Sequence, residues 1–190
     1  MHYFSEIIDK QKSRGDDAMQ PLIKKIEALV ISISVKSGIG FIEALSERDE
    51  SKSAVFRITG QTPLMTKDGH QIGVAAIPVK GKIIAFVDSQ SPLPMVHPPQ
   101  ITPLLIIFDQ YAKKGEVAVG TFDKNFYSEQ LNLKLNLNEN TELVDLQGKR
   151  VDVNSLVGKL LFIFYEKATR SIPAQANPTK IIATNILQSE

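Results

Sequence analysis

The stretch Leu131-Asn132-Leu133-Lys134-Leu135-Asn136-Leu137-Asn138 alternates leucine with a polar residue at every position. Successive side chains of a β-strand point to opposite faces of a sheet, so the four leucines would share one face. The polar residues between them would face water. The alternation therefore predicts a strand with one buried side, as in an antiparallel sheet that covers a core.

Other segments on both sides of this stretch also have the composition of strands. Each is a short run rich in apolar and β-branched residues, bounded by turn-forming residues. The expected strands are residues 54–58, 71–79, 82–87, 116–122, 142–146, 150–153, 160–165 and 181–187. Much of the chain from residue 53 onward is thus predicted to be β-sheet.

Two regions have the spacing of helices instead. Pro21 suits a first helical turn, and apolar residues then recur at helical spacing up to residue 35, although the end of this segment also alternates like a strand. A second short helix is expected at 41–48. Thr102, Pro103 and Gly115 are suitable start and stop residues for a helix over 102–114. The predicted fold class is α+β: N-terminal helices, then a mostly antiparallel β-sheet with one inserted helix.

The length of 190 residues suits a single domain covering 1–190. The loop around Asn125 and the asparagine-rich stretch 136–140 leave open a C-terminal β subdomain from about residue 126. The segment 168–178 has the composition of a solvated connector. No internal repeat is apparent.

Composition excludes several kinds of chemistry. The chain has no cysteine, which removes disulfides, thiolate metal sites and cysteine nucleophiles. The net charge of +1 gives no attraction to nucleic acid or anionic lipid. The first residues do not form a signal peptide, and no apolar run approaches the roughly 20 residues that cross a bilayer. We expect a soluble protein that is cytoplasmic, or one delivered to a host cytosol without a classical signal peptide.

One pair of residues indicates catalytic chemistry. The segments 71–79 and 82–87 flank Lys80-Gly81, which predicts a hairpin with His70 at the start of its first strand and Asp88 at the end of its second. A carboxylate beside an imidazole fixes its tautomer and increases its basicity.

Residues 69–89 resemble the His-strand-turn-strand-Asp element of cysteine-peptidase-fold proteins, in particular ubiquitin-like-protein proteases and Yop-type effector acetyltransferases. The resemblance implies that His70 and Asp88 match the histidine and the acidic residue of those families. The cysteine that those families require is absent, and Ser37, ahead of the predicted 41–48 helix, is the nearest substitute nucleophile. The resemblance therefore implies a degenerate scaffold, a chain whose cysteine was mutated, or one that uses a non-thiol nucleophile.

Three other patterns have both a functional and an ordinary interpretation. Ser37-Gly38-Ile39-Gly40 could cradle a phosphate, but it lacks the remaining residues of either nucleotide fingerprint. His70, Asp88 and His97 could hold a metal, but their spacing matches no compact motif, so no metal or cofactor is predicted. The proline-rich loop 91–99 could be a recognition surface or a stiff connector.

These patterns favour a protein-interaction or adaptor domain without catalytic activity, whose partner is another protein rather than nucleic acid or membrane. The alternative is a hydrolase or acyltransferase that uses His70 and Asp88 as a base pair, with a non-thiol nucleophile or a mutated cysteine. A small-ligand binder that uses the 38–40 loop is a third interpretation. The oligomeric state is not predicted.

Overall fold

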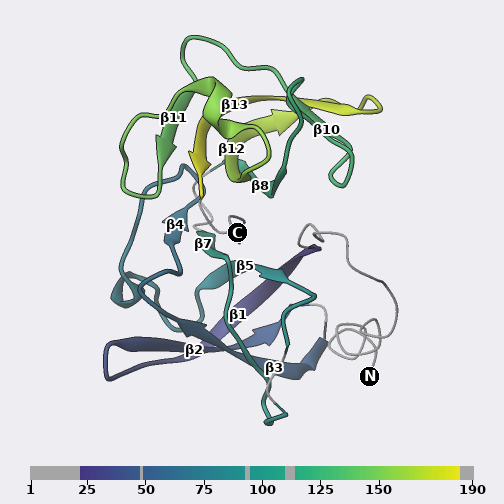
Figure 1. The fold of residues 1–190 in the computed structure, drawn as a ribbon. Helices are drawn as coiled ribbons and strands as arrows, with labels where there is room; N and C mark the ends of the chain where they lie inside the picture. The colour runs from purple at the N-terminus through teal and green to yellow at the C-terminus, as the bar shows by residue number, and fades with distance from the viewer. Residues whose placement is uncertain (1–21, 48, 93–94, 110–113, 185–190) are drawn as a thin grey trace. The chain divides into compact units, whose positions relative to one another are not determined.

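The computed structural model describes residues 22–47, 49–92, 95–109 and 114–184 (Figure 1). These residues divide into two compact units, which we call unit 1 (residues 22–66 and 71–109) and unit 2 (residues 67–70 and 114–184). Both are built almost entirely from β-strands. In the described part of the chain, no helix is long and apolar enough to cross a membrane.

Unit 1 contains one seven-stranded sheet in the order β4-β7-β5-β1-β2-β3-β6. Its long antiparallel strands are β1 (Ile23–Lys36), β2 (Ile39–Ser46), β3 (Asp49–Ile58) and β5 (Lys82–Asp88). Three shorter strands complete it: β4 (Leu64–Thr66), β6 (Gln100–Ile101) and β7 (Leu105–Asp109).

The two ends of this sheet are joined through one segment of chain. β6 pairs parallel to β3, and β7, which follows a few residues later, pairs antiparallel to β5. The segment therefore flanks both β3 and β5, and the sheet must curl round for this to happen. Within the sheet, three consecutive strands and a fourth that returns beside the first, in the order β5-β1-β2-β3, form a Greek key. Ile42, Phe56 and Ile106 are fully buried in the core that the sheet encloses.

Unit 2 is organised around its last strand. β13 (Ala174–Ala183) pairs antiparallel to β12 (Leu160–Ala168) and parallel to both β10 (Leu133–Leu135) and β11 (Glu142–Asp145). β8 (Glu116–Thr121) pairs with β12, and β9 (Tyr127–Ser128) pairs with β10. Leu161, Ile163 and Ile181 are completely buried at the centre of this unit.

The predicted α+β class is wrong, because the expected N-terminal helices are strands. Residues 23–36 and 39–46 form the β1–β2 hairpin; Pro21 lies outside the described residues. In β1, Ile26, Ala28 and Val30 are buried at a spacing of two, and a β-bulge between Val30 and Ser32 then shifts the register by one residue. Ile23 and Leu29, on the opposite face of β1, are half-buried, and the bulge displaces Ile33. Apolar residues from both faces together therefore gave the helical spacing.

The expected inserted helix at 102–114 is also wrong over its described part. Residues 105–109 form β7, which lies between β4 and β5; residues 110–113 lie outside the described residues. Leu105, Ile106 and Ile107 are all buried, as happens in a strand covered on both faces. Periodicity alone does not distinguish such a short apolar run from a buried helix.

The alternating leucine stretch behaves as predicted, over a shorter strand. Leu133 and Leu135 of β10 are buried and Lys134 between them is exposed. Leu131 and Leu137 are half-buried against the same core. The regular strand begins only after Asn132, whose φ of 47° lies in the left-handed region.

Candidate functional site

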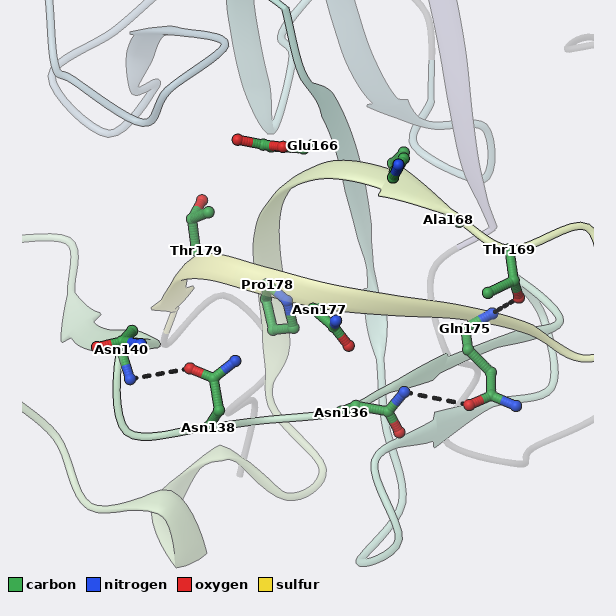
Figure 2. Close-up of a pocket in the computed structure, with 11 residues that line it drawn as sticks. Asn136, Asn138, Asn140, Glu166, Ala168, Thr169, Gln175, Asn177, Pro178 and Thr179 are labelled. Atoms are coloured by element: carbon green, nitrogen blue, oxygen red, sulfur yellow. Dashed lines mark hydrogen bonds between the residues drawn. The ribbon is translucent and has the colours of Figure 1, made fainter.

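Unit 2 has a groove of about 540 Å³ on the side of β13 that carries its polar residues (Figure 2). Its walls are the segment after β10, the end of β12 and the first half of β13. Most of the lining side chains are uncharged amides or hydroxyls: Asn136, Asn138, Asn140, Thr169, Gln175, Asn177 and Thr179. Glu166 and Lys167 add one charge of each sign. The groove is thus polar and close to neutral.

The groove forms where two paired strands lose their register. Tyr165 pairs with Pro178 and Ala168 pairs with Ala176, so Glu166 and Lys167 of β12 lie opposite the single residue Asn177 of β13. Two residues against one is the definition of a β-bulge. Pro178 has no N–H and weakens the ladder further at this point. The local sequence therefore separates the strands at the groove.

Hydrogen bonds hold one wall of the groove in place. The Thr141 hydroxyl donates to the Pro178 carbonyl at 2.9 Å and accepts from the Asn138 N–H at 3.2 Å. The Asn138 side-chain oxygen accepts from the Asn140 N–H at 2.9 Å (Figure 2). The turn 138–141 is thereby tied to β13, which positions the asparagine side chains before any ligand binds.

Across the groove, the two amides Asn136 and Gln175 are in direct contact. Asn136 Nδ2 donates to Gln175 Oε1 at 3.1 Å (Figure 2). An amide has two donor hydrogens and one acceptor oxygen, so this single bond uses only part of what each side chain offers. Among the described residues, the Asn136 side-chain oxygen and the Gln175 side-chain nitrogen make no further hydrogen bond, and both are available to a ligand.

The loop between β12 and β13 ends beside this groove and is internally bonded. The Thr169 hydroxyl lies 2.6 Å from the Ser171 hydroxyl and accepts the Gln175 N–H at 2.9 Å; Ser171 in turn donates to the Pro173 carbonyl at 2.7 Å. This network presents Ile172, whose exposed fraction is 88%. The loop thus exposes an apolar side chain to solvent, while hydrogen bonds within the loop hold its backbone in place.

His70 and Asp88, the predicted catalytic pair, are placed in different units. The hairpin that would have set them side by side is not formed. β5, which ends at Asp88, pairs with β1 and β7, and residues 71–79 contain a single bridge at Gln71 followed by the 3-10 helix Val74–Ala76. The Lys80-Gly81 turn therefore leads into β5 from a loop, not from a strand.

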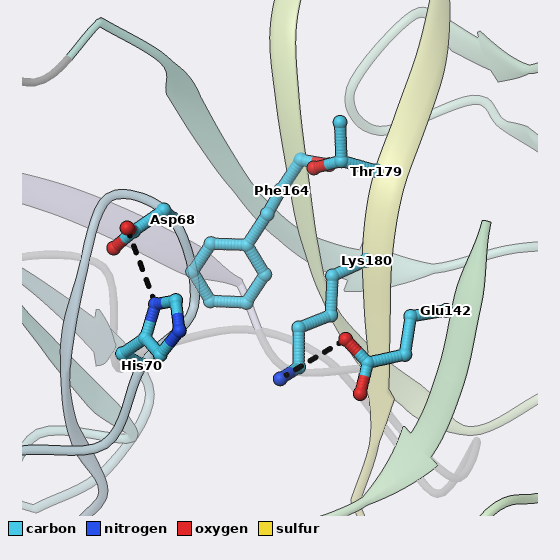
Figure 3. Close-up of polar contacts among 6 residues, drawn as sticks. All are labelled: Asp68, His70, Glu142, Phe164, Thr179 and Lys180. Carbon is cyan, nitrogen blue, oxygen red and sulfur yellow. Dashed lines mark hydrogen bonds and ion pairs between the residues drawn. The ribbon is translucent and has the colours of Figure 1, made fainter. Parts of the chain in front are cut away.

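Each member of the predicted pair has partners close by in the chain. His70 Nδ1 lies 3.2 Å from Asp68 Oδ2, and 76% of the His70 side chain is exposed (Figure 3). The Asp88 carboxylate accepts the Gln90 N–H at 3.0 Å and the Ser91 hydroxyl at 3.3 Å. Asp88 thus stabilises the turn that follows β5.

Ser37 and Gly38 form the tight turn between β1 and β2. Both have positive φ, 50° and 77°, which is the geometry of a type I′ hairpin turn. A strand, β2, follows this turn, so the helix N-terminus on which a phosphate-cradling loop depends is absent at Gly38–Gly40. His97 is exposed in the loop before β6. In the described residues, no three histidine or acidic side chains are grouped so that they could hold a metal ion.

Gly69, within the 67–70 segment of unit 2, is tightly packed. A Cβ there would lie 2.9 Å from Cδ of Lys180 and 3.3 Å from the Phe164 ring. Lys180 Nζ pairs with Glu142 Oε2 at 3.4 Å, and the Thr179 hydroxyl donates to the Phe164 carbonyl at 3.1 Å (Figure 3). These contacts are packing and support, and they add no reactive group.

Two groups in unit 2 have clearly altered acidity. Burial, and secondarily the nearby Glu116 carboxylate, raises the pKa of the Tyr165 hydroxyl, so this phenol stays neutral. The Tyr127 backbone N–H, bonded to the Asp123 carboxylate, is the main cause that lowers the pKa of Asp123. Neither residue lines the groove.

No protein-family model, curated protein or solved structure matches the chain. The groove residues were not predicted as a site, although the unusual polar composition of both segments that form its walls was noted in the sequence. The asparagine-rich stretch 136–140 was interpreted as a boundary and 168–178 as a connector, because polar residues of this kind ordinarily face bulk water. Their convergence depends on the pairing of β13 with both β10 and β12, which no local pattern reveals.

Proposed function

We propose that this chain is a cytoplasmic protein-interaction module without catalytic activity, and that unit 2 binds an extended segment of another protein in its amide-lined groove. The observation that supports this most directly is the Asn136–Gln175 pair, which retains an unused acceptor and unused donors. An extended peptide presents backbone N–H and C=O groups in alternation. Side-chain amides carry the same two kinds of group and can bond to both.

The composition of the groove favours a peptide over the other polymers. One positive and one negative side chain give no net attraction to phosphates. The described lining residues include no aromatic side chain on which a base or a sugar ring could stack. A neutral amide groove is compatible with a peptide backbone whatever its charge.

The exposed Ile172 supports a protein partner as well. Its side chain is presented by a loop whose hydrogen bonds are already made, so little conformational entropy would be lost on binding. An apolar anchor beside a polar groove matches the common composition of protein interfaces, in which a few buried side chains supply most of the affinity.

The enzyme alternative and the resemblance to cysteine-peptidase folds stay predictions from the sequence. No observation favours them over binding: His70 is exposed beside Asp68, and Asp88 accepts bonds from the turn that follows it. The groove lining contains no histidine. We therefore assign the groove no reaction.

A peptide-library experiment tests this function. Random short peptides with blocked termini are displayed, selected on the immobilised full chain, and the best binder is measured by isothermal titration calorimetry. The double variant Asn136→Ala/Gln175→Ala should bind it roughly tenfold more weakly or worse, because bonds to both free amide groups are lost. The control Gln147→Ala removes an exposed amide of unit 2 outside the groove and should bind like the wild type.

Two outcomes would overturn the proposal. In one, no peptide is enriched, or the enriched peptides bind the double variant as tightly as the wild type. In the other, a glycan array gives a ligand whose binding is lost in the double variant while peptides give none, which would make the groove a carbohydrate site.

A further inference from the structure

The two units repeat the same order of elements. In unit 1 the order along the chain is β1, β2, β3, β4, a 3-10 turn, β5, β6 and β7. In unit 2 the order is β8, β9, β10, β11, a 3-10 turn, β12 and β13. The pairings correspond as well. β4 pairs parallel to β7 as β11 does to β13, β5 pairs antiparallel to β7 as β12 does to β13, and β3 pairs parallel to β6 as β10 does to β13.

The correspondence extends to single residues. Leu64 pairs with Ile106 in unit 1, and Leu143 pairs with Ile181 in unit 2. The isolated bridge Met65–Gln71 matches the bridge Val144–Arg150. Phe56 pairs with Ile101 where Leu135 pairs with Ala176. From 55 to 76, every matched residue of unit 1 has its counterpart at one constant offset along the chain.

One turn is reproduced hydrogen bond by hydrogen bond. The Thr62 hydroxyl accepts the Thr59 N–H at 3.3 Å, and the Thr141 hydroxyl accepts the Asn138 N–H at 3.2 Å. The Thr59 hydroxyl accepts the Gln61 N–H at 3.2 Å, and the Asn138 side chain accepts the Asn140 N–H at 2.9 Å. The turn that forms one wall of the unit 2 groove therefore has a counterpart in unit 1.

Identical residues also occur at the same offsets along the chain in the two repeats of this strand order, the first of which includes segment 67–70 in its sequence. Thr62, Leu64 and Gly69 match Thr141, Leu143 and Gly148, and Gln100, Pro103 and Ile106 match Gln175, Pro178 and Ile181. Shared sequence, register and turn bonding together indicate that the chain is a tandem duplication of one β unit. No repeat is apparent in the sequence alone because few of the matched positions carry identical residues.

This equivalence identifies the residues of unit 1 that correspond to the groove. Gln100 takes the place of Gln175, Thr59 that of Asn138 and Gln61 that of Asn140; Asp88 takes the place of Glu166 and Arg57 that of Asn136. We call these five residues the Arg57 surface. Gln61 and Gln100 keep the amides and Asp88 keeps the carboxylate of the counterpart residues, whereas two amides are replaced: Asn138 by the hydroxyl of Thr59 and Asn136 by the guanidinium of Arg57.

We propose that the Arg57 surface is a second peptide-binding site, selective for a segment that carries an acidic side chain; this rests on the function proposed for unit 2. Among the described residues, the Arg57 side chain makes no ion pair or hydrogen bond, and the residue is partly exposed. The Asp88 carboxylate accepts hydrogen bonds from Gln90 and Ser91 in the turn that follows β5. A guanidinium binds a carboxylate through two parallel hydrogen bonds, which a neutral amide cannot reproduce.

The test uses the full chain carrying Asn136→Ala/Gln175→Ala, so that the unit 2 groove is disabled. Two peptide pools with blocked termini are compared: one has a central Asp or Glu, and the other has Asn or Gln at the same position. Acidic peptides should bind, neutral ones roughly tenfold more weakly, and adding Arg57→Gln should remove the difference. Arg57→Lys, which keeps the charge without the fork, should restore part of it, and Arg150→Gln, an exposed arginine of unit 2, should change nothing.

Amide NMR spectra of the unmutated chain give a readout that needs no variant to fold. Adding the best acidic peptide should shift the side-chain amide signals of Gln61 and Gln100. Equal binding of the two pools, or no shift of these signals, would overturn the second site. If acidic peptides bind at Arg57 and no peptide binds the unit 2 groove, the function proposed for unit 2 is refuted and the second site stands. If peptides bind the unit 2 groove and acidic peptides do not bind at Arg57, the second site is refuted and the function proposed for unit 2 stands.

Discussion

Gly69 and Gly148 occupy matching positions in the two repeats, with φ of 75° and 78°, yet only Gly69 is packed against side chains. Both follow a short strand that pairs parallel to a longer one, and both occupy the left-handed region that glycine adopts without strain. Around Gly148 nothing lies within 4 Å of where a Cβ would be, whereas around Gly69 the Phe164 ring and Lys180 fill that space.

This difference predicts unequal costs for the same substitution. Gly148→Ala should lower the free energy of unfolding by about 1 kcal/mol, the cost of the positive φ alone. Gly69→Ala adds the contact with the Phe164 ring and should cost about 1–3 kcal/mol more than Gly148→Ala. Urea denaturation measures both, and equal costs would show that Gly69 is not tightly packed in solution.

Leu133 and Lys134 are neighbours on opposite faces of β10. Leu133→Ala should destabilise the protein by about 2–5 kcal/mol, because the leucine is buried in the unit 2 core. Lys134→Ala should cost less than about 0.5 kcal/mol, because that side chain is exposed. Thermal and urea unfolding check both values, and similar effects of the two substitutions would be incompatible with a one-sided strand.

The sequence predicted where sheet forms more reliably than where helix forms. The Leu131–Leu137 alternation correctly predicted that Leu133 and Leu135 are buried, because only one face of β10 packs against the core. In β1, apolar residues occupy both faces before the bulge beside Ile31, so together they fell at helical spacing. The run Leu105–Phe108 is apolar because consecutive residues of β7 are buried, so both faces of the strand are covered, which is a property of the tertiary structure.

The candidate site depended even more on tertiary structure. His70 and Asp88 were paired through an assumed hairpin, but the segment before β5 lacks a strand that could pair with it. Asn136 and Gln175 are far apart in the chain and meet only because β10 and β13 are parallel neighbours. Parallel pairing of distant segments leaves no local sequence signal. The sequence therefore showed that each wall of the groove is polar, but it could not predict that the two walls are adjacent.

Asp123 provides a prediction about pH. Its carboxylate accepts the N–H groups of Asn125 and Tyr127 at 2.8 and 2.9 Å in the turn between β8 and β9, and its pKa is lowered, chiefly by the Tyr127 bond. A lowered folded-state pKa means that the stabilisation is complete above the ordinary value of 3.8 and is lost as pH falls through the folded-state value.

Asp123→Ala should therefore lower the melting temperature at neutral pH, and its difference from the wild type should shrink in acid. Differential scanning calorimetry at about pH 7 and about pH 2 measures this. Asp123→Asn keeps the acceptor oxygen without the charge and should show less of the pH dependence. A gap that is the same at both pH values would mean that the charge of Asp123 does not contribute.

Ile172 allows binding to be separated from stability. Its side chain is 88% exposed, so Ile172→Ser should leave the melting temperature almost unchanged. If the side chain is an anchor for a protein partner, the same substitution should weaken binding of the selected peptide several-fold, because apolar area that the partner buries is lost. The matched control is Val157→Ser, an exposed apolar residue of unit 2 outside the groove, which should alter neither quantity. Unchanged affinity for Ile172→Ser, measured by calorimetry beside this control, would restrict recognition to the amides of the groove.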